Sequence, residues 1–307
     1  VAPEDVVQSI DVPSIYLVPV KMHEQHLDEI VLRLTHTPSE SEPHMAPWLN
    51  FLHKMENATK PVTIGLVGKY VELQDAYKSI NEALFQAATY ADHKLDLRYI
   101  HSEKLDEQNV DSTLRDMDGV IIAPGFGQRG IEGKFVALKW CREHDVPTFG
   151  ICLGMQCMVI EFARNVLGYA DANSTEMNST TPHNVIDLME EQKSISNMGG
   201  TMRLGAYDCH LRPGSLAAAA YGTEHVSERH RHRFEFNEKY RGEFEKNGML
   251  CVGENPLSHL VEVVEIPGKR WFLGTQYHPE YSSTVLHPSP LFRSFVNAAI
   301  AYRDERK

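Results

Sequence analysis

The sequence has little of what binding to nucleic acids or membranes requires. Its 307 residues include 30 Lys and Arg against 42 Asp and Glu, a formal net charge of −12. An acidic chain whose one basic run is 229–233 is a poor candidate for binding nucleic acid or an anionic membrane surface. No apolar run is long enough to span a bilayer, and the N-terminal residues show no secretory signal. We therefore expect a cytoplasmic protein with neither kind of partner.

Patterns for disulfides, metals and nucleotide phosphates are also missing. The five cysteines are an odd number and no two have CxxC spacing, which argues against a disulfide framework and a zinc site. His230 and His232 alternate along a predicted strand without a carboxylate or cysteine in a ligand-like pattern, which favours a hydrogen-bonded pair over a metal site. Gly65–Tyr70 has two residues between its glycines where a phosphate loop needs four. We predict no metal and no cofactor for this chain by itself.

What is present divides the chain near residue 57. The first 57 residues carry too few apolar elements for a complete domain, and we interpret them as the tail of another domain plus a connector. Their predicted elements are a strand-like run at 12–19, a helix at 26–34, a polar linker at 35–47 and a helix at 47–54.

From residue 58 onward, strands alternate with helices as in an α/β domain with a mostly parallel central sheet covered on both faces. The predicted strands are 62–68, 95–100, 120–123 and 146–149, and the helices are 77–91, 135–143 and 153–167. A polar loop or flap at 168–200 leads into a β-rich second half. Its strands are 201–211, 225–237, 249–253, 260–266 and 271–277, with helices at 216–221, 238–247 and 290–302. In parallel sheets the active site lies at the carboxyl ends of the strands.

Val146–Gln156 predicts a strand, a sharp turn and a helix, with Cys152 at the turn. A cysteine in the first turn of a helix meets the positive end of the helix dipole, which favours the thiolate. Gly150 allows an unusual backbone conformation, and Gly154 leaves room for a substrate. A nucleophile elbow and a buried structural cysteine are equally compatible with this stretch alone.

A cysteine nucleophile needs a base, a group that orients the base, and donors for the oxyanion. His278 follows a predicted strand, as the cysteine does, and Glu280 can fix its tautomer, although by itself this motif is more typical of a turn. The glycine-rich loop 123–130 can direct the amide of Gly125 at a ligand, and the amide of Leu153 would be the second donor. An ordinary strand-to-helix loop is the alternative.

The three motifs in this order, Pro-Gly-Phe-Gly, Gly-Ile-Cys-Leu-Gly-Met-Gln and His-Pro-Glu, resemble the class I (triad) glutamine amidotransferases. Longer stretches resemble the CTP synthase family over almost the whole chain: 64–70, 75–80, 173–176, 198–205 and 228–237. The resemblance implies a triad of Cys152, His278 and Glu280 that hydrolyses L-glutamine through a cysteinyl thioester. The glutamine contacts that it implies are Gly125, Leu153, Gly154, Met155, Gln156, Glu176 and Arg233.

The resemblance further implies an ATP- and Mg-dependent amination of UTP by a synthetase domain of the same polypeptide, with GTP as activator and a homotetramer as the assembly. Asp11–Tyr16 resembles the end of that domain, and Ile10, Asp11 and Val12 match a stretch that touches ATP in the family. Residues 1–57 are thus assigned to the end of the synthetase domain and a linker, and 58–307 to the amidotransferase domain. We expect this chain alone to hydrolyse glutamine at most.

Two other interpretations compete with this one. Another triad amidotransferase, of the GMP or carbamoyl-phosphate type, is disfavoured by the Arg-His-Arg-His-Arg and Gly-Gly-Thr-Met-Arg-Leu-Gly stretches. A non-catalytic binding or regulatory relative with the same fold is disfavoured because the three triad residues are kept. One departure from the family is that a single glycine, Gly125, follows Ala123-Pro124 where two are frequent; it keeps its place before Phe126, and with it the oxyanion role.

Overall fold

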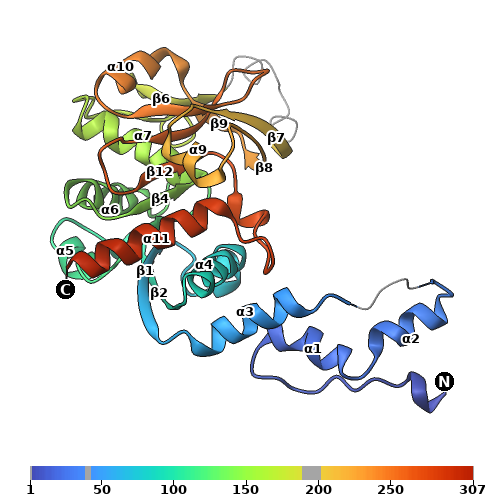
Figure 1. Cartoon of the computed structure of the whole chain (residues 1–307). Helices are drawn as coiled ribbons and strands as arrows, with labels where there is room; N and C mark the ends of the chain where they lie inside the picture. The colour runs from blue at the N-terminus through green and yellow to red at the C-terminus, as the bar shows by residue number, and fades with distance from the viewer. Residues whose placement is uncertain (1, 39–42, 189–201, 307) are drawn as a thin grey trace. The chain divides into compact units, whose positions relative to one another are not determined.

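The structure is a computed structural model that describes residues 2–38, 43–188 and 202–306. It divides the chain into two compact units, Val1–Ala58 and Thr59–Lys307 (Figure 1). The predicted boundary between residues 57 and 58 lies beside this division. The assignment of the first unit to the end of a synthetase domain stays a prediction.

The described residues of the smaller unit form three α-helices that pack on a few aromatic and aliphatic side chains. These helices are α1 (Val18–His23), α2 (Leu27–Leu34) and α3 (Ala46–Asn57). The Tyr16 ring lies 5.3 Å from that of Phe51, and its carbonyl oxygen accepts a hydrogen bond of 2.8 Å from Trp48. The helices predicted at 26–34 and 47–54 are confirmed.

The strand predicted at 12–19 is wrong. The segment forms a 3-10 turn at Ile15–Leu17 that continues into α1. Ser14 caps this turn by accepting from the amide of Tyr16, and Pro19 lies in the first turn of α1, where its missing N–H costs nothing. Within the described residues this segment pairs with no other strand, so an extended conformation would leave its backbone groups without ladder partners.

The larger unit is built on a nine-stranded sheet in the order β2-β1-β3-β4-β12-β11-β10-β7-β8. The first five strands of this order are parallel and the rest pair antiparallel, which confirms the predicted α/β fold with a β-rich second half. The strands are β1 (Lys60–Gly68), β2 (His93–His101), β3 (Gly119–Ile122), β4 (Thr148–Ile151), β7 (Arg203–Leu211), β8 (His225–His232), β10 (Leu250–Glu254), β11 (Val261–Glu265) and β12 (Phe272–Thr275).

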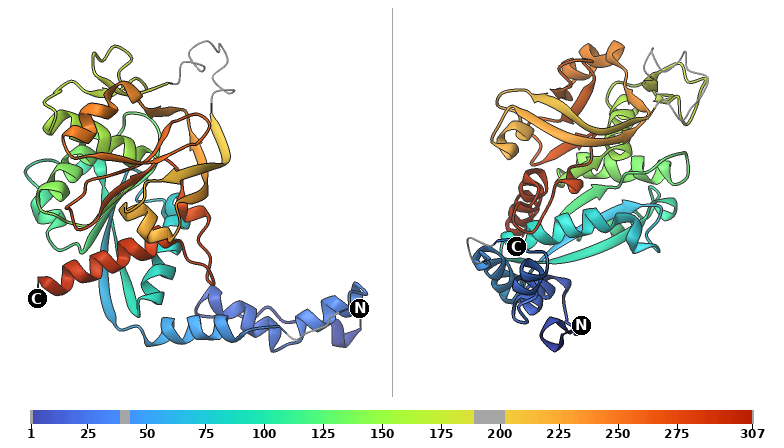
Figure 2. Two further views of the ribbon diagram at one scale, coloured as in Figure 1. Left: turned by 45° about the horizontal axis from the view of Figure 1, so that its top comes forward. Right: turned by 90° about the vertical axis from the view of Figure 1, so that its right-hand side faces the viewer.

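Helices cover both faces of this sheet (Figures 1 and 2). Each helix layer contributes to its own apolar cluster. One face carries α5 (Val110–Leu114), α6 (Ile131–Glu143), α7 (Leu153–Asn165) and α10 (Arg241–Lys246). The other carries α4 (Lys78–Tyr90), α9 (Leu216–Tyr221) and α11 (Pro290–Glu305). The mostly apolar, buried runs of β1, β3 and β4 are what two-sided burial requires.

The stretch predicted as a loop at 168–200 is more structured than expected where it is described. It contributes β5 (Asn173–Ser174) and β6 (Asn184–Leu188) to a small sheet with β9 (Phe234–Phe236). Residues 189–200 of that prediction, and Met198–Thr201 of the family-like stretch, lie outside the described residues.

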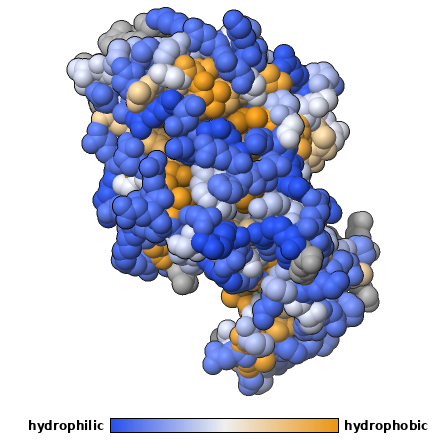
Figure 3. All heavy atoms as spheres, turned by 90° about the vertical axis from the view of Figure 1, so that its left-hand side faces the viewer, coloured by the Kyte–Doolittle hydropathy of each residue, from blue (hydrophilic) through white to orange (hydrophobic). Residues whose placement is uncertain are grey.

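No helix in the described ranges is long and apolar enough to cross a membrane. The face of the protein in Figure 3 is mostly hydrophilic, with hydrophobic side chains in separate patches. Such a surface is ordinary for a folded domain.

Candidate active site

The order of the central strands brings three predicted motifs to one edge of the sheet. β3, β4 and β12 are neighbours, with Ile122 paired to Gly150 and Ile151 paired to Thr275. The glycine-rich loop follows β3, Cys152 follows β4 and His278 follows β12 shortly after its end. Because these strands are parallel, their carboxyl ends meet at the same edge.

Cys152 sits on a strained corner between β4 and α7. Its φ is 53° and its ψ is −105°, a backbone conformation that residues other than glycine rarely adopt. Such strain persists only where the surroundings hold it, and it concentrates at functional sites. As the N-cap of the 13-residue helix α7, Cys152 also lies at the positive end of the helix dipole. The predicted elbow geometry is therefore present.

Gly150 and Gly154, on either side of Cys152, allow close packing. The unusual backbone conformation predicted for Gly150 and the substrate space predicted for Gly154 are not found there. A Cβ on Gly154 would lie 2.1 Å from the carbonyl oxygen of Ile122, so the space beside it belongs to β3 and not to a substrate. A Cβ on Gly150 would lie 2.7 Å from Met158 Sδ, and the positive φ belongs to Cys152 itself. Both glycines let α7 approach the sheet closely.

The Cys152 thiol is buried, with 2% of the residue exposed. Its Sγ lies 3.7 Å from Gln276 Nε2 and 3.9 Å from the carbonyl oxygen of Arg231. Its own amide donates to the Thr275 carbonyl oxygen at 2.7 Å. This amide is thus engaged in the sheet, which is compatible with the prediction that the next amide, that of Leu153, serves the oxyanion.

His278 and Glu280 form the hydrogen-bonded pair that the sequence predicts. His278 Nδ1 lies 2.8 Å from Glu280 Oε1, and both residues are buried. Glu280 accepts a hydrogen bond from Nδ1–H, which leaves the buried Nε2 as the reactive nitrogen that interacts with Cys152. Burial opposes the imidazolium form, yet Cys152 and Glu280 together raise the pKa of His278 to about 11. The raised pKa of His278 favours its imidazolium form beside the cysteine.

A small pocket of about 10 Å³ opens on the cysteine, room for about one water. Its lining residues are Gly125, Phe126, Cys152, Gln156, Glu176, His232, Arg233 and Phe234. Glutamine needs more room than one water, so the pocket has to widen to bind it. Four predicted contacts line the pocket, and three others, Leu153, Gly154 and Met155, do not. Those three are buried residues of α7, and their roles as glutamine contacts stay predictions.

Glu176 and Arg233 place opposite charges at this pocket. Glu176 Oε1 accepts from the amide of Gly127 at 2.9 Å, which ties the segment after β5 to the glycine-rich loop. Gln128 adds a second tie by donating to the carbonyl oxygen of Met177. A carboxylate and a guanidinium in one pocket match the α-ammonium and α-carboxylate of an amino acid.

The sequence did not single out Phe126, Phe234 or Gln276 as site residues. Phe126 follows Gly125 directly, so its place beside the pocket could have been read from the loop. Phe234 and Gln276 act through contacts between distant segments, for which the sequence contains no local signal. Ile10, Asp11 and Val12 lie in the smaller unit in a segment without helix or strand, and their ATP contact stays a prediction.

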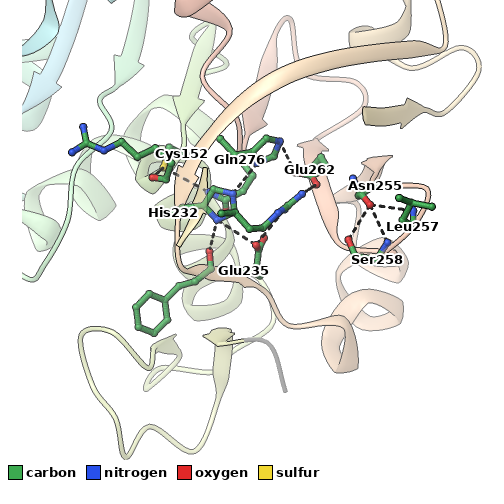
Figure 4. A network of polar contacts seen from close by, with 12 residues as sticks. Cys152, His232, Glu235, Asn255, Leu257, Ser258, Glu262 and Gln276 are labelled. Atoms are coloured by element: carbon green, nitrogen blue, oxygen red, sulfur yellow. Dashed lines mark hydrogen bonds and ion pairs between the residues drawn. The ribbon is translucent and has the colours of Figure 1, made fainter. Parts of the chain in front are cut away.

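In the alternating His-Arg run of β8, the histidines lie on the buried side of the strand and the arginines on the exposed side. His230 Nδ1 lies 2.8 Å from His232 Nε2, which confirms the predicted hydrogen-bonded pair. Arg203 binds Glu235 and Glu262 at 3.2 and 2.9 Å, and these carboxylates approach the two imidazoles (Figure 4). Across the described part of the chain, no group of three or more His, Cys, Asp or Glu is arranged to hold a metal ion.

Comparison with known proteins agrees with this geometry. The family model for "Glutamine amidotransferase class-I" matches residues 72–298. A CTP synthase of Porphyromonas gingivalis is 62% identical over all 307 residues, and one of Bacteroides fragilis is 64% identical over 98% of the chain. The chain spans only 57% and 56% of the lengths of these relatives.

Solved structures give the same picture. The glutaminase domain of Trypanosoma brucei CTPS with bound acivicin is 37% identical, with a TM-score of 0.73 over 78% of this chain and 94% of that chain. A putative GMP synthase protein from Thermoplasma acidophilum is 14% identical, with a TM-score of 0.51 over 80% of this chain and 97% of that chain, which shows the fold alone.

Proposed function

Because the chain belongs to the class-I glutamine amidotransferase family, we propose that it hydrolyses L-glutamine through a thioester on Cys152 and releases ammonia for the amination of UTP by a CTP synthase. The observation that carries the glutaminase step is the interaction of His278, held by the buried Glu280, with Cys152 on its strained corner. The opposite charges of Glu176 and Arg233 beside the cysteine fit an amino-acid substrate.

Acylation begins with attack of the Cys152 thiolate on the carboxamide carbon of glutamine. The carbonyl π electrons move to the oxygen, where the amides of Gly125 and Leu153 are proposed to receive the negative charge. The intermediate collapses as the C–N bond breaks, and His278 Nε2 gives its proton to the departing ammonia. The products are a γ-glutamyl thioester, free ammonia and a neutral imidazole that Glu280 still orients.

Deacylation uses the same groups in reverse roles. Once the sulfur is acylated its negative charge is gone, and with it one cause of the raised pKa of His278. The neutral imidazole can then take a proton from water while the oxygen attacks the thioester carbon and the C–S bond breaks. Glutamate leaves, and the thiolate–imidazolium pair returns.

The test is glutamate release by the full chain, measured beside Cys152→Ala and Glu280→Gln. We expect no detectable hydrolysis by Cys152→Ala, and a loss of 100-fold or more in kcat for Glu280→Gln, since the orienting carboxylate fixes the tautomer (on the order of the loss seen in other triads). A parent chain that binds glutamine without releasing glutamate would instead support the non-catalytic relative.

The rest of the reaction is proposed from the likeness to CTP synthases. In this proposal ATP activates UTP in the synthetase domain, with Mg, and the ammonia reaches it within a cytoplasmic homotetramer. Since the 307 residues carry no phosphate loop, we expect this chain alone to yield glutamate and ammonia but no CTP. Formation of CTP from UTP, ATP and glutamine by this chain would contradict that expectation.

GTP is proposed as the activator, and the protein surface beside the pocket has suitable chemistry for a nucleotide. Lys69 and Arg129 lie over the Tyr70 ring at 5.1 and 5.3 Å, and Arg231 lies over the Phe126 ring at 6.0 Å. Exposed aromatic rings stack on bases, and the cations suit phosphates. Glutaminase rates with and without GTP test this step.

A further inference from the structure

Gln276 is a buried polar residue beside the nucleophile that the mechanism above leaves without a role. It follows β12, its relative exposure is 0%, and its backbone amide donates to the Glu262 carbonyl oxygen at 2.8 Å. Its side chain extends toward Cys152, with Nε2 3.7 Å from Sγ (Figure 4). A fully buried amide needs partners for its donors, and here one partner is the reacting sulfur.

The orientation of this amide is set by Gln156. Gln156 Nε2 lies 2.9 Å from the carbonyl oxygen of Phe234, which can only accept, so the atom of Gln156 at this place must be the NH2 nitrogen. The same nitrogen lies 3.1 Å from the side chain of Gln276, which must therefore turn its oxygen toward Gln156. The NH2 group of Gln276 is left facing the sulfur of Cys152.

Beside His278, two further polar groups near the sulfur favour different protonation states. The carbonyl oxygen of Arg231, 3.9 Å away, can accept the proton of the thiol but repels the thiolate. The N–H of Gln276 gains strength when its acceptor is charged, as hydrogen bonds to ions do. The amide of Gln276 is thus arranged to favour the attacking form of the cysteine.

We infer that Gln276 is a catalytic residue whose side-chain amide donates to Cys152 Sγ and stabilises the thiolate, both before attack and when sulfur leaves the thioester. Gln156 is then a positioning residue that acts through Gln276. This inference rests on the proposed glutaminase function, since it assigns a further group to the same reaction.

Two substitutions separate the donor from mere packing. Gln276→Glu keeps the oxygen that accepts from Gln156 but replaces the donor with an acceptor, and Gln276→Met removes both. The control is Gln86→Glu, the same change at a buried glutamine of α4 whose oxygen accepts from Ser283. All variants are made in the full chain.

The readout is the rate of Cys152 alkylation by iodoacetamide as a function of pH, located by fragment mass spectrometry. This reaction needs the thiolate but not glutamine. For Gln276→Met we expect the midpoint to rise by about one pH unit, and for Gln276→Glu by more, because a carboxylate repels the thiolate. We also expect kcat/KM for glutamine to fall about tenfold or more.

The outcomes distinguish the two proposals. If the alkylation midpoints of both Gln276 variants equal those of the parent and of Gln86→Glu, the role of Gln276 is overturned, whatever the activity of these variants. A parent chain that alkylates at Cys152 but releases no glutamate would overturn the proposed function and leave the assignment of the donor standing. If Gln276→Met does not fold, the near-isosteric Gln276→Glu decides alone.

Discussion

Gly154 shows how a single missing Cβ shapes the site. The carbonyl oxygen of Ile122 occupies the place where its Cβ would be, at 2.1 Å, so Gly154→Ala must push α7 away from β3. We expect a loss of about 1–3 kcal/mol in the free energy of unfolding, typical of an overpacked contact. Glutaminase activity should fall as well, because the displaced helix carries Cys152 at its N-cap. Urea unfolding and kcat/KM measure both effects.

The matched control for that change is Gly242→Ala. Gly242 lies in the short helix α10 and a Cβ there would meet nothing within 4 Å. Alanine should keep or raise stability by about 0.5–1 kcal/mol, since it reduces the freedom of the unfolded chain. Equal losses at the two positions would show that the contact with Ile122 is not the cause.

Lys134 is a buried cation that holds the start of the oxyanion loop. Its Nζ donates to the Ala123 carbonyl oxygen at 2.6 Å, and burial lowers its pKa. Lys134→Met leaves that carbonyl unpaired, which costs about 1–3 kcal/mol, but also removes a buried charge. We therefore expect glutaminase kcat/KM to fall about tenfold, because Gly125 is displaced. The melting temperature should change little, because the two effects on stability oppose each other.

The control for Lys134 is Lys139→Met on the same helix. Lys139 is partly exposed and reaches Glu107 only at 3.5 Å, so its loss should change neither activity nor stability appreciably. Comparable activity of Lys134→Met and Lys139→Met would contradict the anchoring role of Lys134.

The buried histidines of strand β8 make the stability of the protein depend on pH. Burial, aided by the charges of His232 and Arg203, lowers the pKa of His230 to about 2. The unfolded chain protonates this histidine below about pH 6.5, whereas the folded protein does not. The free energy of unfolding therefore falls as the pH drops below 6.5, by about 1.4 kcal/mol per unit for each such histidine.

Glu262 acts in the opposite direction over part of this range. Burial raises its pKa to about 7, so the folded protein binds this proton before the unfolded chain does at about pH 4.5. Burial also raises the pKa of Glu235. Proton uptake by these two carboxylates therefore offsets much of the stability lost through the histidines between pH 7 and 4.5, and the loss of stability steepens below 4.5. Urea unfolding at several pH values measures this curve. His230→Gln should flatten its acid arm, and His225→Gln, at an exposed position of the same strand, should not.

Among the elements, those predicted best are the ones that carry their own signal. β1, β3 and β4 are apolar runs, and α4 and α7 have regular apolar spacing, so their local pattern and tertiary role agree. The strand predicted at 12–19 failed because strand-like residues need a partner strand, and none is described there. The pairing of β5, β6 and β9 was missed because these strands are short and β9 lies far from the other two in the sequence.

At the scale of the whole molecule, the site could be predicted only to the extent that the order of the strands in the sheet could be predicted. Cys152 and His278 each follow a strand, and the parallel pairing of β4 with β12 makes them neighbours. By contrast, the chain of contacts from the Phe234 carbonyl oxygen through the side chain of Gln156 to that of Gln276 joins segments about 80 to 120 residues apart in the sequence, and no spacing rule predicts it.

The division into two units predicts that Thr59–Lys307 folds and works without the residues before it. Both large apolar clusters begin at Val62 or later, so this unit has its own core. We expect residues 59–307 to unfold in one transition, with a melting temperature within a few degrees of the full chain and the same rate of Cys152 alkylation. Thermal circular dichroism and the alkylation assay provide the measurements. The control begins at residue 69 and lacks β1, which pairs with both β2 and β3. Because its removal leaves β2 without a partner and opens one edge of β3, this control should not fold. A 59–307 chain that behaves like the control would show that the first unit is needed for the fold.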